Sequence, residues 1–338
     1  MDRRSGFSVK NRNRAALALS LFFPAMLCIL LPGTLDAAEP PRDLAYFQDR
    51  ALAGKPTFHD VIERIRIGTS IVPDRIGAFS TMHEHLSFPA DTDSENDFLD
   101  EAYGPLRAEI GIAYAQLAAT RGQVAELRHN LQLLSQLVEL STTLYAAGKL
   151  DQAGALQSQI DWERMSETLL ALEKQEKVWS TRLNVLIGAN PQDSIPEIQP
   201  LQEYEPAFDG RQLAEEYKSR RFFTVFAQAV SNAATATSGN GPHAASLDIE
   251  ADAFIAQARA VLEDLFLRTR RYRTVLIPLA EQAQAARMQA YKTGKAEFGA
   301  LLQGLRDLSD MRREYQAMLG EMHVLKAEVE EDTGHPLN

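Results

Sequence analysis

The sequence predicts a mainly α-helical protein built from two tandem, long antiparallel helical hairpins of the α-barrel kind, with a small or rudimentary β portion. Three observations predict this fold class. A Tyr-x-x-Gly-Lys segment occurs twice, 146 residues apart. Each copy is flanked by long stretches in which apolar residues return every three or four positions, which is typical of amphipathic helices. Proline is concentrated outside those stretches, where a continuous helix is not required.

Length and composition exclude several classes of protein. The 338 residues carry 46 acidic and 35 basic side chains and a single cysteine. One cysteine excludes an internal disulfide and a cysteine-rich zinc site. The net charge of −11 argues against a general nucleic-acid binder, whose surface would be basic. The length fits about two domains, and the composition alone does not indicate a function.

Residues 1–38 have the pattern of a secretory signal peptide. Five basic residues precede an apolar run over residues 15–31, and small residues follow it, so we expect cleavage after Ala37 or Ala38. An uncleaved N-terminal anchor is the alternative, because the run approaches the length of a membrane span, although Pro24 interrupts it. The exported chain would be acidic and free of cysteine.

Residues 39–95 are expected to form an extended N-terminal segment, because five prolines interrupt them. Within this segment only residues 76–88 offer a plausible strand region. In His83-Glu-His85 the two histidines share one face of a strand and could bind a metal, but no further ligand is evident. Exposure to solvent is the preferred explanation, and we predict no metal site.

The first helical hairpin repeat is expected over residues 96–190. Its first helix carries two apolar stripes on different faces, so it needs a neighbour on each side. The stripes are Leu127, Leu131, Leu134 and Val138, and Leu133, Leu137, Leu140 and Leu144. The second helix has one stripe with a single polar member, Glu176, at Trp162, Met165, Leu169, Leu172, Glu176, Trp179, Leu183 and Leu186. Steps of three and four residues keep such a stripe against one neighbouring helix.

A proline-rich link and a short helix are expected over residues 191–246, with the helix running from Gln212 to Ala234. The second hairpin repeat then covers residues 247–334. In its second helix the stripe of the first repeat returns at the same offset, at Leu308, Met311, Tyr315, Met318, Met322, Leu325 and Val329. The methionines in this stripe are interpreted as packing residues. In its first helix a similar register is held by Phe254, Ala258, Val261, Leu265, Tyr272, Val275 and Leu279. Arg268 breaks this register. The run from Arg268 to Arg273 is interpreted as a solvated helix face, with Glu263 and Asp264 as candidate partners.

The repeated Tyr-x-x-Gly-Lys segment is expected at the turn of each hairpin. The copies are Tyr145-Ala-Ala-Gly148-Lys149 and Tyr291-Lys-Thr-Gly294-Lys295. Glycine adopts a positive φ without a steric penalty, which is what the end of a helix commonly needs. The turns of the two hairpins would therefore have the same structure.

A resemblance to a known protein family is strongest in the C-terminal half. The matching residues there are Ile277-Pro278-Leu279-Ala280, Tyr291, Gly294-Lys295, Phe298, Leu301-Leu302, Arg306, Leu308, Tyr315 and Glu328 to Gly334. In the N-terminal half they are Tyr145, Gly148, Leu156, Leu183-Asn184, Leu186 and Gly188. With these residues the chain resembles the outer-membrane efflux proteins of the TolC type, and among them the heavy-metal branch that partners RND pumps. The two copies cover roughly half of the chain.

The resemblance implies a homotrimer whose hairpins form an α-helical barrel across the periplasm, below a portion in the outer membrane. The protein would be a passive conduit for exported solutes, with heavy-metal cations as a candidate cargo, and neither an enzyme nor a cofactor-binding protein. Its partners would be a periplasmic adaptor and an RND inner-membrane pump, with no nucleic acid. The tips facing the adaptor would be Tyr145, Gly148, Lys149, Tyr291, Gly294 and Lys295.

Asp151 and Glu297 lie three residues after the two turn glycines and could form an acidic ring at the aperture of such a trimer. The preferred alternative is that they are solvated acids that interact favourably with a helix N-terminus. The family's gate carboxylates usually lie further along this helix, at the positions of Gly154, Gln157, Ala300 and Gln303.

The chain departs from the family in the space left for membrane strands. Family members insert two β-hairpins per subunit, and a membrane strand needs about 9 to 11 residues. Only about a dozen residues separate the short helix ending near Ala234 from the helix beginning near Leu247. A periplasmic, non-spanning coiled-coil relative that has lost the pore is therefore the alternative. An adaptor protein is disfavoured, because an adaptor usually has one helical hairpin and this sequence predicts two.

Overall fold

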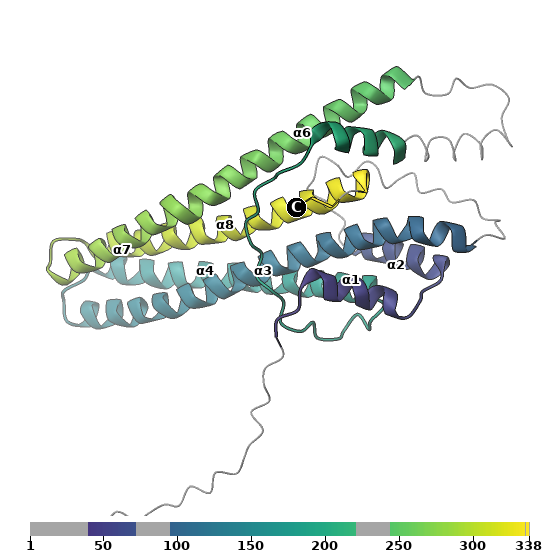
Figure 1. Cartoon of the computed structure of the whole chain (residues 1–338). Coiled ribbons are helices and arrows are strands. Elements are labelled where there is room, and N and C mark those ends of the chain that lie inside the picture. Colours follow the sequence, from purple (N-terminus) through teal and green to yellow (C-terminus); the bar gives the residue numbers. More distant parts are fainter. Residues whose placement is uncertain (1–39, 72–94, 221–243, 335, 338) are drawn as a thin grey trace, which may run out of the picture. The chain divides into compact units, whose positions relative to one another are not determined.

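The computed structural model describes residues 40–71, 95–220, 244–334 and 336–337 (Figure 1). The expected signal peptide, the strand region at residues 76–88 with its two histidines, and residues 221–234 of the expected short helix lie outside the described residues. The body considered below is formed within the unit Pro41–Asn338.

Two long antiparallel hairpins dominate this body, which confirms the predicted fold class. The first consists of α3 (Glu95–Ala146) and α4 (Gln152–Leu186). The second consists of α6 (Ala244–Arg271), the π-helical η2 (Tyr272–Leu276) and α7 (Ile277–Lys292), followed by α8 (Phe298–Thr333). Pro105 is accommodated inside α3.

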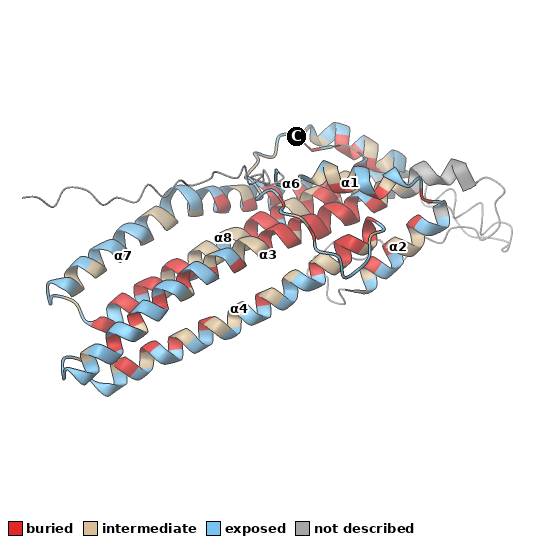
Figure 2. Ribbon diagram, turned by 90° about the horizontal axis from the view of Figure 1, so that it is seen from below, coloured by how far each residue is buried: buried red, intermediate tan, exposed pale blue. Residues whose placement is uncertain are grey.

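The helices of the two hairpins lie in a row with α3 and α8 at its centre. α3 packs against both α4 and α8, and α8 packs against α3 on one side and α6, η2 and α7 on the other. Figure 2 shows buried residues concentrated along α3 and α8, whereas α4 and α7 are largely exposed on their outer sides. The two outer helices therefore form the open flanks of the row.

Smaller elements cover the end of the body away from the hairpin turns. α1 (Leu44–Ala53) and α2 (Phe58–Ser70) pack on the first hairpin, so this part of the segment expected to be extended is helical instead. Pro56 lies between the two helices, and α2 starts with a capping box in which Thr57 and Asp60 satisfy each other's backbone N–H groups. A helix over residues 210–220 packs on α6 in the second hairpin. The β structure within the described residues is one isolated parallel bridge between Arg42 and Ile198.

Three apolar clusters hold the body together. One joins α1 and α2 to α3 and α4, and a second joins residues 210–220 and α6 to α8. The third lies closer to the turns and joins α3, α4 and α8 around Leu134, Met165 and Leu302. Met318 and Met322 are buried in the second cluster, as their interpretation as packing residues requires.

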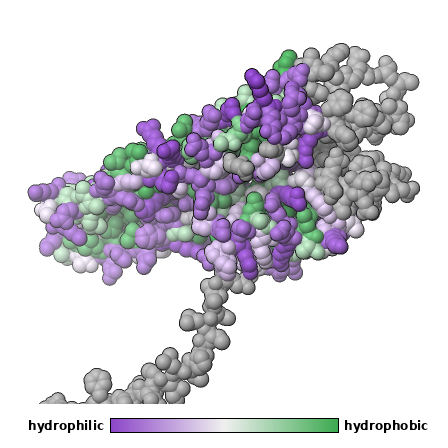
Figure 3. All heavy atoms as spheres, viewed as in Figure 1, coloured by the Kyte–Doolittle hydropathy of each residue, from purple (hydrophilic) through white to green (hydrophobic). Residues whose placement is uncertain are grey.

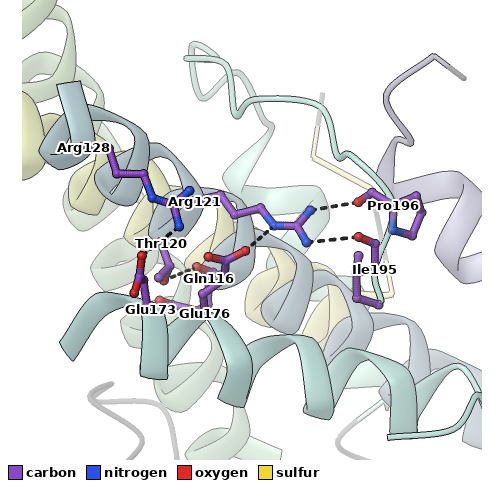
Figure 4. Close-up of polar contacts among 8 residues, drawn as sticks. All are labelled: Gln116, Thr120, Arg121, Arg128, Glu173, Glu176, Ile195 and Pro196. Carbon is purple, nitrogen blue, oxygen red and sulfur yellow. Dashed lines mark hydrogen bonds and ion pairs between the residues drawn. The ribbon is translucent and has the colours of Figure 1, made fainter. Parts of the chain in front are cut away.

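Polar contacts fix α3 against α4 (Figure 4). Arg121 donates from Nε to Oε1 of Glu176 at 2.9 Å, and from its two Nη atoms to the carbonyl oxygens of Pro196 and Ile195. Arg128 pairs with Glu173 at 2.8 Å. The polar member of the α4 stripe therefore has a partner, and its arginine also holds the proline-rich link against the hairpin.

The π-helical segment interrupts the first helix of the second hairpin close to Pro278. A proline has no N–H to donate to the carbonyl four residues earlier, and its ring collides with that carbonyl. The helix instead forms a π-helical turn here, in which the N–H of Ile277 donates to the carbonyl of Tyr272 five residues earlier. Four residues before the start of this segment, Arg268 pairs with Asp264 at 3.7 Å, whereas Glu263 pairs with Arg259. Arg268 is exposed, as a solvated helix face requires, and of its two candidate partners Asp264 is the one that pairs with it.

Candidate functional site: hairpin tips and open flanks

Both hairpin turns are built by the same hydrogen bonds. In the first, Gly148 N donates to the carbonyl of Tyr145 at 2.9 Å, and Lys149 N donates to the carbonyl of Leu144 at 2.8 Å. In the second, Gly294 N donates to Tyr291 at 3.0 Å, and Lys295 N donates to Ala290 at 2.8 Å. The two glycines have φ of +67° and +71°, in the left-handed region that a side chain disfavours. The repeat in sequence is thus a repeat in structure.

The tyrosines of the two turns differ in their surroundings. Tyr145 is 47% exposed. Tyr291 is half-buried, because its ring lies 5.7 Å from that of Phe298, and burial raises its pKa. The residue that corresponds to Phe298 in the first hairpin is Gln152, which supplies no ring. Lys149 and Lys295 are exposed at both turns.

The two acidic residues after the turns also differ. Asp151 is the N-cap of α4, and its Oδ1 accepts a hydrogen bond from Gly154 N at 2.8 Å. Glu297 occupies the same position before α8 but makes no side-chain cap. Both residues are exposed. Capping of α4 is a sufficient reason for an acid at position 151, as expected at a helix N-terminus.

Further along the same helices, Gln157 and Gln303 occupy two of the positions at which the resemblance would place gate carboxylates. Gln157 donates to Asp161 at 2.9 Å, and Gln303 donates to Asp307 at 2.6 Å, so each amide is held by an acid four residues later. Arg306 joins the two sets, because it donates to Asp161 at 2.9 Å and to Gln303 at 2.7 Å. The Asp161 side chain is 2% exposed. This network ties α4 to α8 and was not predicted from the sequence; the available signal was that Asp161 and Asp307 are identical residues 146 positions apart.

The outer face of α4 carries a groove of about 580 Å³, called here the α4 groove. It is lined by Leu156, Gln159, Ile160, Glu163, Arg164, Ser166, Glu167 and Leu170. The three apolar members of this set are 44 to 57% exposed. Sequence reasoning identified only the opposite stripe of this helix; the available signal was the spacing of Leu156 and Ile160, which lie one turn apart and off that stripe.

The opposite flank of the row is apolar as well. Val261, Leu267, Val275 and Leu279 are 38 to 63% exposed along α6, η2 and α7, and none of the residues of α7 is buried. The stripe predicted from Phe254 to Leu279 is therefore divided between a packed face, which includes Ala258 and Leu265, and this free face. Figure 3 shows exposed apolar residues among polar ones toward the end that holds the turns.

Within the described residues, no three His, Cys, Asp or Glu side chains lie close enough together to hold a metal ion. None of the described helices is long and apolar enough to cross a membrane.

No family model and no curated protein sequence matches the chain. Its structure is similar to that of the outer membrane protein VceC from Vibrio cholerae, with a TM-score of 0.56 and 14% identity over 87% of this chain and 97% of that one. For CusC, described as forming a transmembrane channel, the TM-score is 0.57 and the identity 10%, over 86% and 97% of the two chains. For the outer-membrane channel OprN the TM-score is 0.53 and the identity 14%, over 86% of this chain and 89% of that one.

The chain has the TolC-type fold. At identities of 10 to 14%, the likeness concerns the fold and not the cargo. It extends to channels of several kinds, so the heavy-metal branch is not singled out. The two hairpins of the TolC-type fold correspond to the two repeats of this sequence.

Proposed function

We propose that the protein is the outer-membrane channel component of a tripartite RND-type efflux system and acts as a homotrimer. The observation that carries the proposal is the open row of helices, which leaves an apolar flank on α4 and another on α6, η2 and α7. Large exposed apolar surfaces usually mark contacts with other molecules. Further copies of the chain would cover both flanks and would close the row into a tube. The similarity to outer-membrane channels supports this reading.

The role of the chain is that of a passive conduit without a catalytic group or cofactor. The proton-driven pump in the inner membrane supplies the energy, and the channel supplies the path across the periplasm and the outer membrane. Tyr145, Gly148 and Lys149, with Tyr291, Gly294 and Lys295, face the adaptor at the two turns. Asp151 and Glu297 lie beside them as solvated acids at the starts of α4 and α8. Heavy-metal cations are the candidate cargo that the resemblance of the C-terminal stretch suggests.

Fractionation tests the location and the assembly together. A channel component is recovered with the outer membrane, requires detergent for extraction and migrates as a trimer. Recovery of a monomer by osmotic shock would instead support the periplasmic, non-spanning relative. Sensitivity of a deletion strain to copper, zinc or cadmium salts, compared with its sensitivity to organic solutes, tests the proposed cargo.

Charge reversal at the tips tests the adaptor contact. The double variant Lys149→Glu/Lys295→Glu should reduce co-purification of the adaptor at least tenfold, while recovery from the outer membrane stays unchanged, because both side chains are exposed and neither turn depends on them. Lys177→Glu, an exposed lysine of α4 far from the turn, is the matched control. Equal co-purification by the tip variant and the control would contradict the placement of the tips.

A further inference from the structure

The packed face of the first helix of the second hairpin shifts by one residue at η2. In α6 the buried positions follow one another in steps of four and three, at Ala251, Ile255, Ala258, Leu262, Leu265 and Thr269. In α7 the same steps connect half-buried positions, at Ile277, Ala280, Gln284, Arg287 and Tyr291. Continued without a shift, the steps of α6 would lead to Leu276, Leu279, Ala283, Ala286 and Ala290 instead. The π-helical turn takes up the extra residue.

The register that α7 adopts packs the more polar of these two sets. Gln284 Nε2 donates to the carbonyl of Leu301 at 3.3 Å, but its Oε1 is buried without a hydrogen-bond partner among the described residues. Gln284 and Arg287 both lie over Gly304 of α8. The other set consists only of leucine and alanine, and its Leu279 is 56% exposed. Apolar burial alone would therefore favour the other register, so further contacts must hold the observed one.

Side chains of η2 are held by acids on two other elements. Tyr272 Oη donates to Glu314 of α8 at 2.6 Å. Arg273 Nε donates to Oε1 of Glu203 at 2.9 Å, and Arg273 Nη2 pairs with Oε2 of the same carboxylate at 2.9 Å. Two parallel bonds between a guanidinium and a carboxylate fix orientation as well as distance. The Arg273–Glu203 pair therefore fixes the direction in which this part of η2 faces.

Glu203 is itself fixed in place by the packing of the proline-rich link. Its side chain is 8% exposed, and Tyr315 of α8 donates a second contact to its Oε1 at 3.1 Å. The next residue, Tyr204, donates from Oη to the carbonyl of Met322 at 3.3 Å. The link is thus fastened to α8, which does not share the shift of α7, and Glu203 provides a fixed point for η2.

The first hairpin lacks both features that accompany the π-helical turn. At the positions of Arg273 and Pro278 it has Leu127 and Gln132, and α3 is α-helical from Glu95 to Ala146. Proline disfavours an unbroken helix on either side of it but can be accommodated by a kink, as at Pro105 of α3. The contact with the link is therefore the feature that distinguishes the two registers of α7.

We propose that η2 is a register switch for α7 and that Glu203 is the positioning residue that holds it. Without the Arg273–Glu203 pair, the π-helical turn moves along α7 toward the hairpin turn, and the residues that it passes rotate by about 100°. Gln284 and Arg287 then leave α8, and Ala283 and Ala286 replace them. Loss of this contact exchanges an apolar surface beside the second tip for a cationic one. The inference goes beyond the proposed function and does not depend on it.

Disulfide formation within the full chain, in a Cys28→Ser background, reports the register. In the first hairpin the Oγ atoms of Ser141 and Ser158 lie 2.7 Å apart, and the residues that correspond to them are Arg287 and Gly304. Arg287→Cys with Gly304→Cys therefore reports the observed register, because a disulfide requires Cα atoms about 4.4 to 6.8 Å apart. Ala286→Cys with Gly304→Cys reports the shifted register. Ser141→Cys with Ser158→Cys is the control in the hairpin without a π-helical turn.

Removal of Glu203 should change which pair forms. In the otherwise unchanged chain, oxidation of the reduced protein should link positions 287 and 304 about tenfold faster than positions 286 and 304. Glu203→Ala should lower this ratio several-fold and leave the rate for positions 141 and 158 unchanged. The same cysteines are compared with and without Glu203, so their own effect on the register cancels. Glu205→Ala removes an exposed acid of the same link and should leave the ratio unchanged.

A second variant guards against a general effect on the link. Arg273→Ala removes the pair while leaving the link residues intact, and it should shift the ratio in the same direction as Glu203→Ala. An unchanged ratio in both variants overturns the switch. Slower formation of all three disulfides would overturn it too, because Glu203 would then support the whole body and not the register of α7. The readout is the same for a membrane channel and for a periplasmic relative, so neither result bears on the proposed function.

Discussion

The two hairpins have the same turn and nearly the same length, yet their first helices lie in different surroundings. α3 is packed on both sides, by α4 and by α8, and is buried along most of its first half. The corresponding helix of the second hairpin is packed by α8 on one side, contains a π-helical segment and ends in α7, which has no buried residue. Sequence repetition has therefore reproduced the hairpin but not its environment.

The side chains at corresponding positions of the two first helices differ in the same way as their environments. Where α3 meets α8 it carries Gly122, Glu126 and Asn130, a small residue and two polar residues with partners on α8. The corresponding residues of the second hairpin are Arg268, Tyr272 and Leu276, which are larger. The α3–α8 interface combines tight packing with short hydrogen bonds. Tyr272 instead contacts α8 of its own hairpin and donates a hydrogen bond to Glu314 at 2.6 Å. Position in the row, and not membership of the repeat, decides how a helix is packed.

The largest effect is expected at a buried ion pair that only the first hairpin has. Arg182 of α4 pairs with Glu109 of α3, and both side chains are at most 1% exposed. The residue corresponding to Glu109 in the second hairpin is Ile255. Arg182→Met leaves the Glu109 charge buried without this cation, and should lower the free energy of unfolding by about 3 to 5 kcal/mol. Urea denaturation followed by circular dichroism measures the loss.

The matched control removes both charges. Glu109→Leu/Arg182→Met should be destabilised less than Arg182→Met alone, because no ion remains buried without a partner. An equal loss in the single and double variants would show that Arg182 acts by packing and not through the ion pair.

A pair of leucines at equivalent positions tests the comparison next. Leu302 is 1% exposed between α8, α3 and α4, whereas Leu156, which corresponds to it on α4, is 47% exposed. Leu302→Ala should cost about 2 to 5 kcal/mol, as for other buried leucines. Leu156→Ala should change the stability of the monomeric chain by no more than about 0.5 kcal/mol. Thermal unfolding at a concentration where the chain is monomeric compares them, and similar losses would contradict the assignment of α4 to an open flank.

The fold and the turns followed from local features of the sequence. Gly148 and Gly294 were identified because a positive φ and a helix end require little beyond the residue itself. The apolar stripe of α4 was identified because helix periodicity specifies which residues share a face. The turn expected at Tyr145 to Lys149 agrees with the observed end of α3 at Ala146 and the start of α4 at Gln152.

The flanks and the buried contacts did not follow from the sequence, because they depend on which helices become neighbours. Leu133 and Leu140 belong to a predicted stripe of α3 but remain 37 and 38% exposed. Arg182 looked like any other charged residue of a long helix, and nothing local indicated that Glu109 would lie beside it. Pro278, inside an otherwise helical pattern, was the one available sign of the π-helical segment.

The smallest effect is a pH dependence that belongs to the second hairpin. His323 of α8 is half-buried beside Tyr204, with Nε2 2.8 Å from the carbonyl oxygen of Gln202. Burial, with a smaller contribution from the charge of Lys326, lowers the pKa of His323 below its usual value near 6.5. The residue that corresponds to it in the first hairpin is Lys177, which is exposed.

The sign of the dependence follows from the lowered pKa. Between the folded and unfolded pKa values only the unfolded chain binds a proton at this residue, so stability is complete above about pH 6.5 and declines as the pH falls toward the folded pKa. His323→Gln should therefore reduce the difference in melting temperature between pH 7.5 and pH 5.5, whereas Lys177→Gln should leave it unchanged. An equal reduction by both variants would mean that the acid sensitivity does not arise from the histidine, and the two hairpins would not differ in this respect.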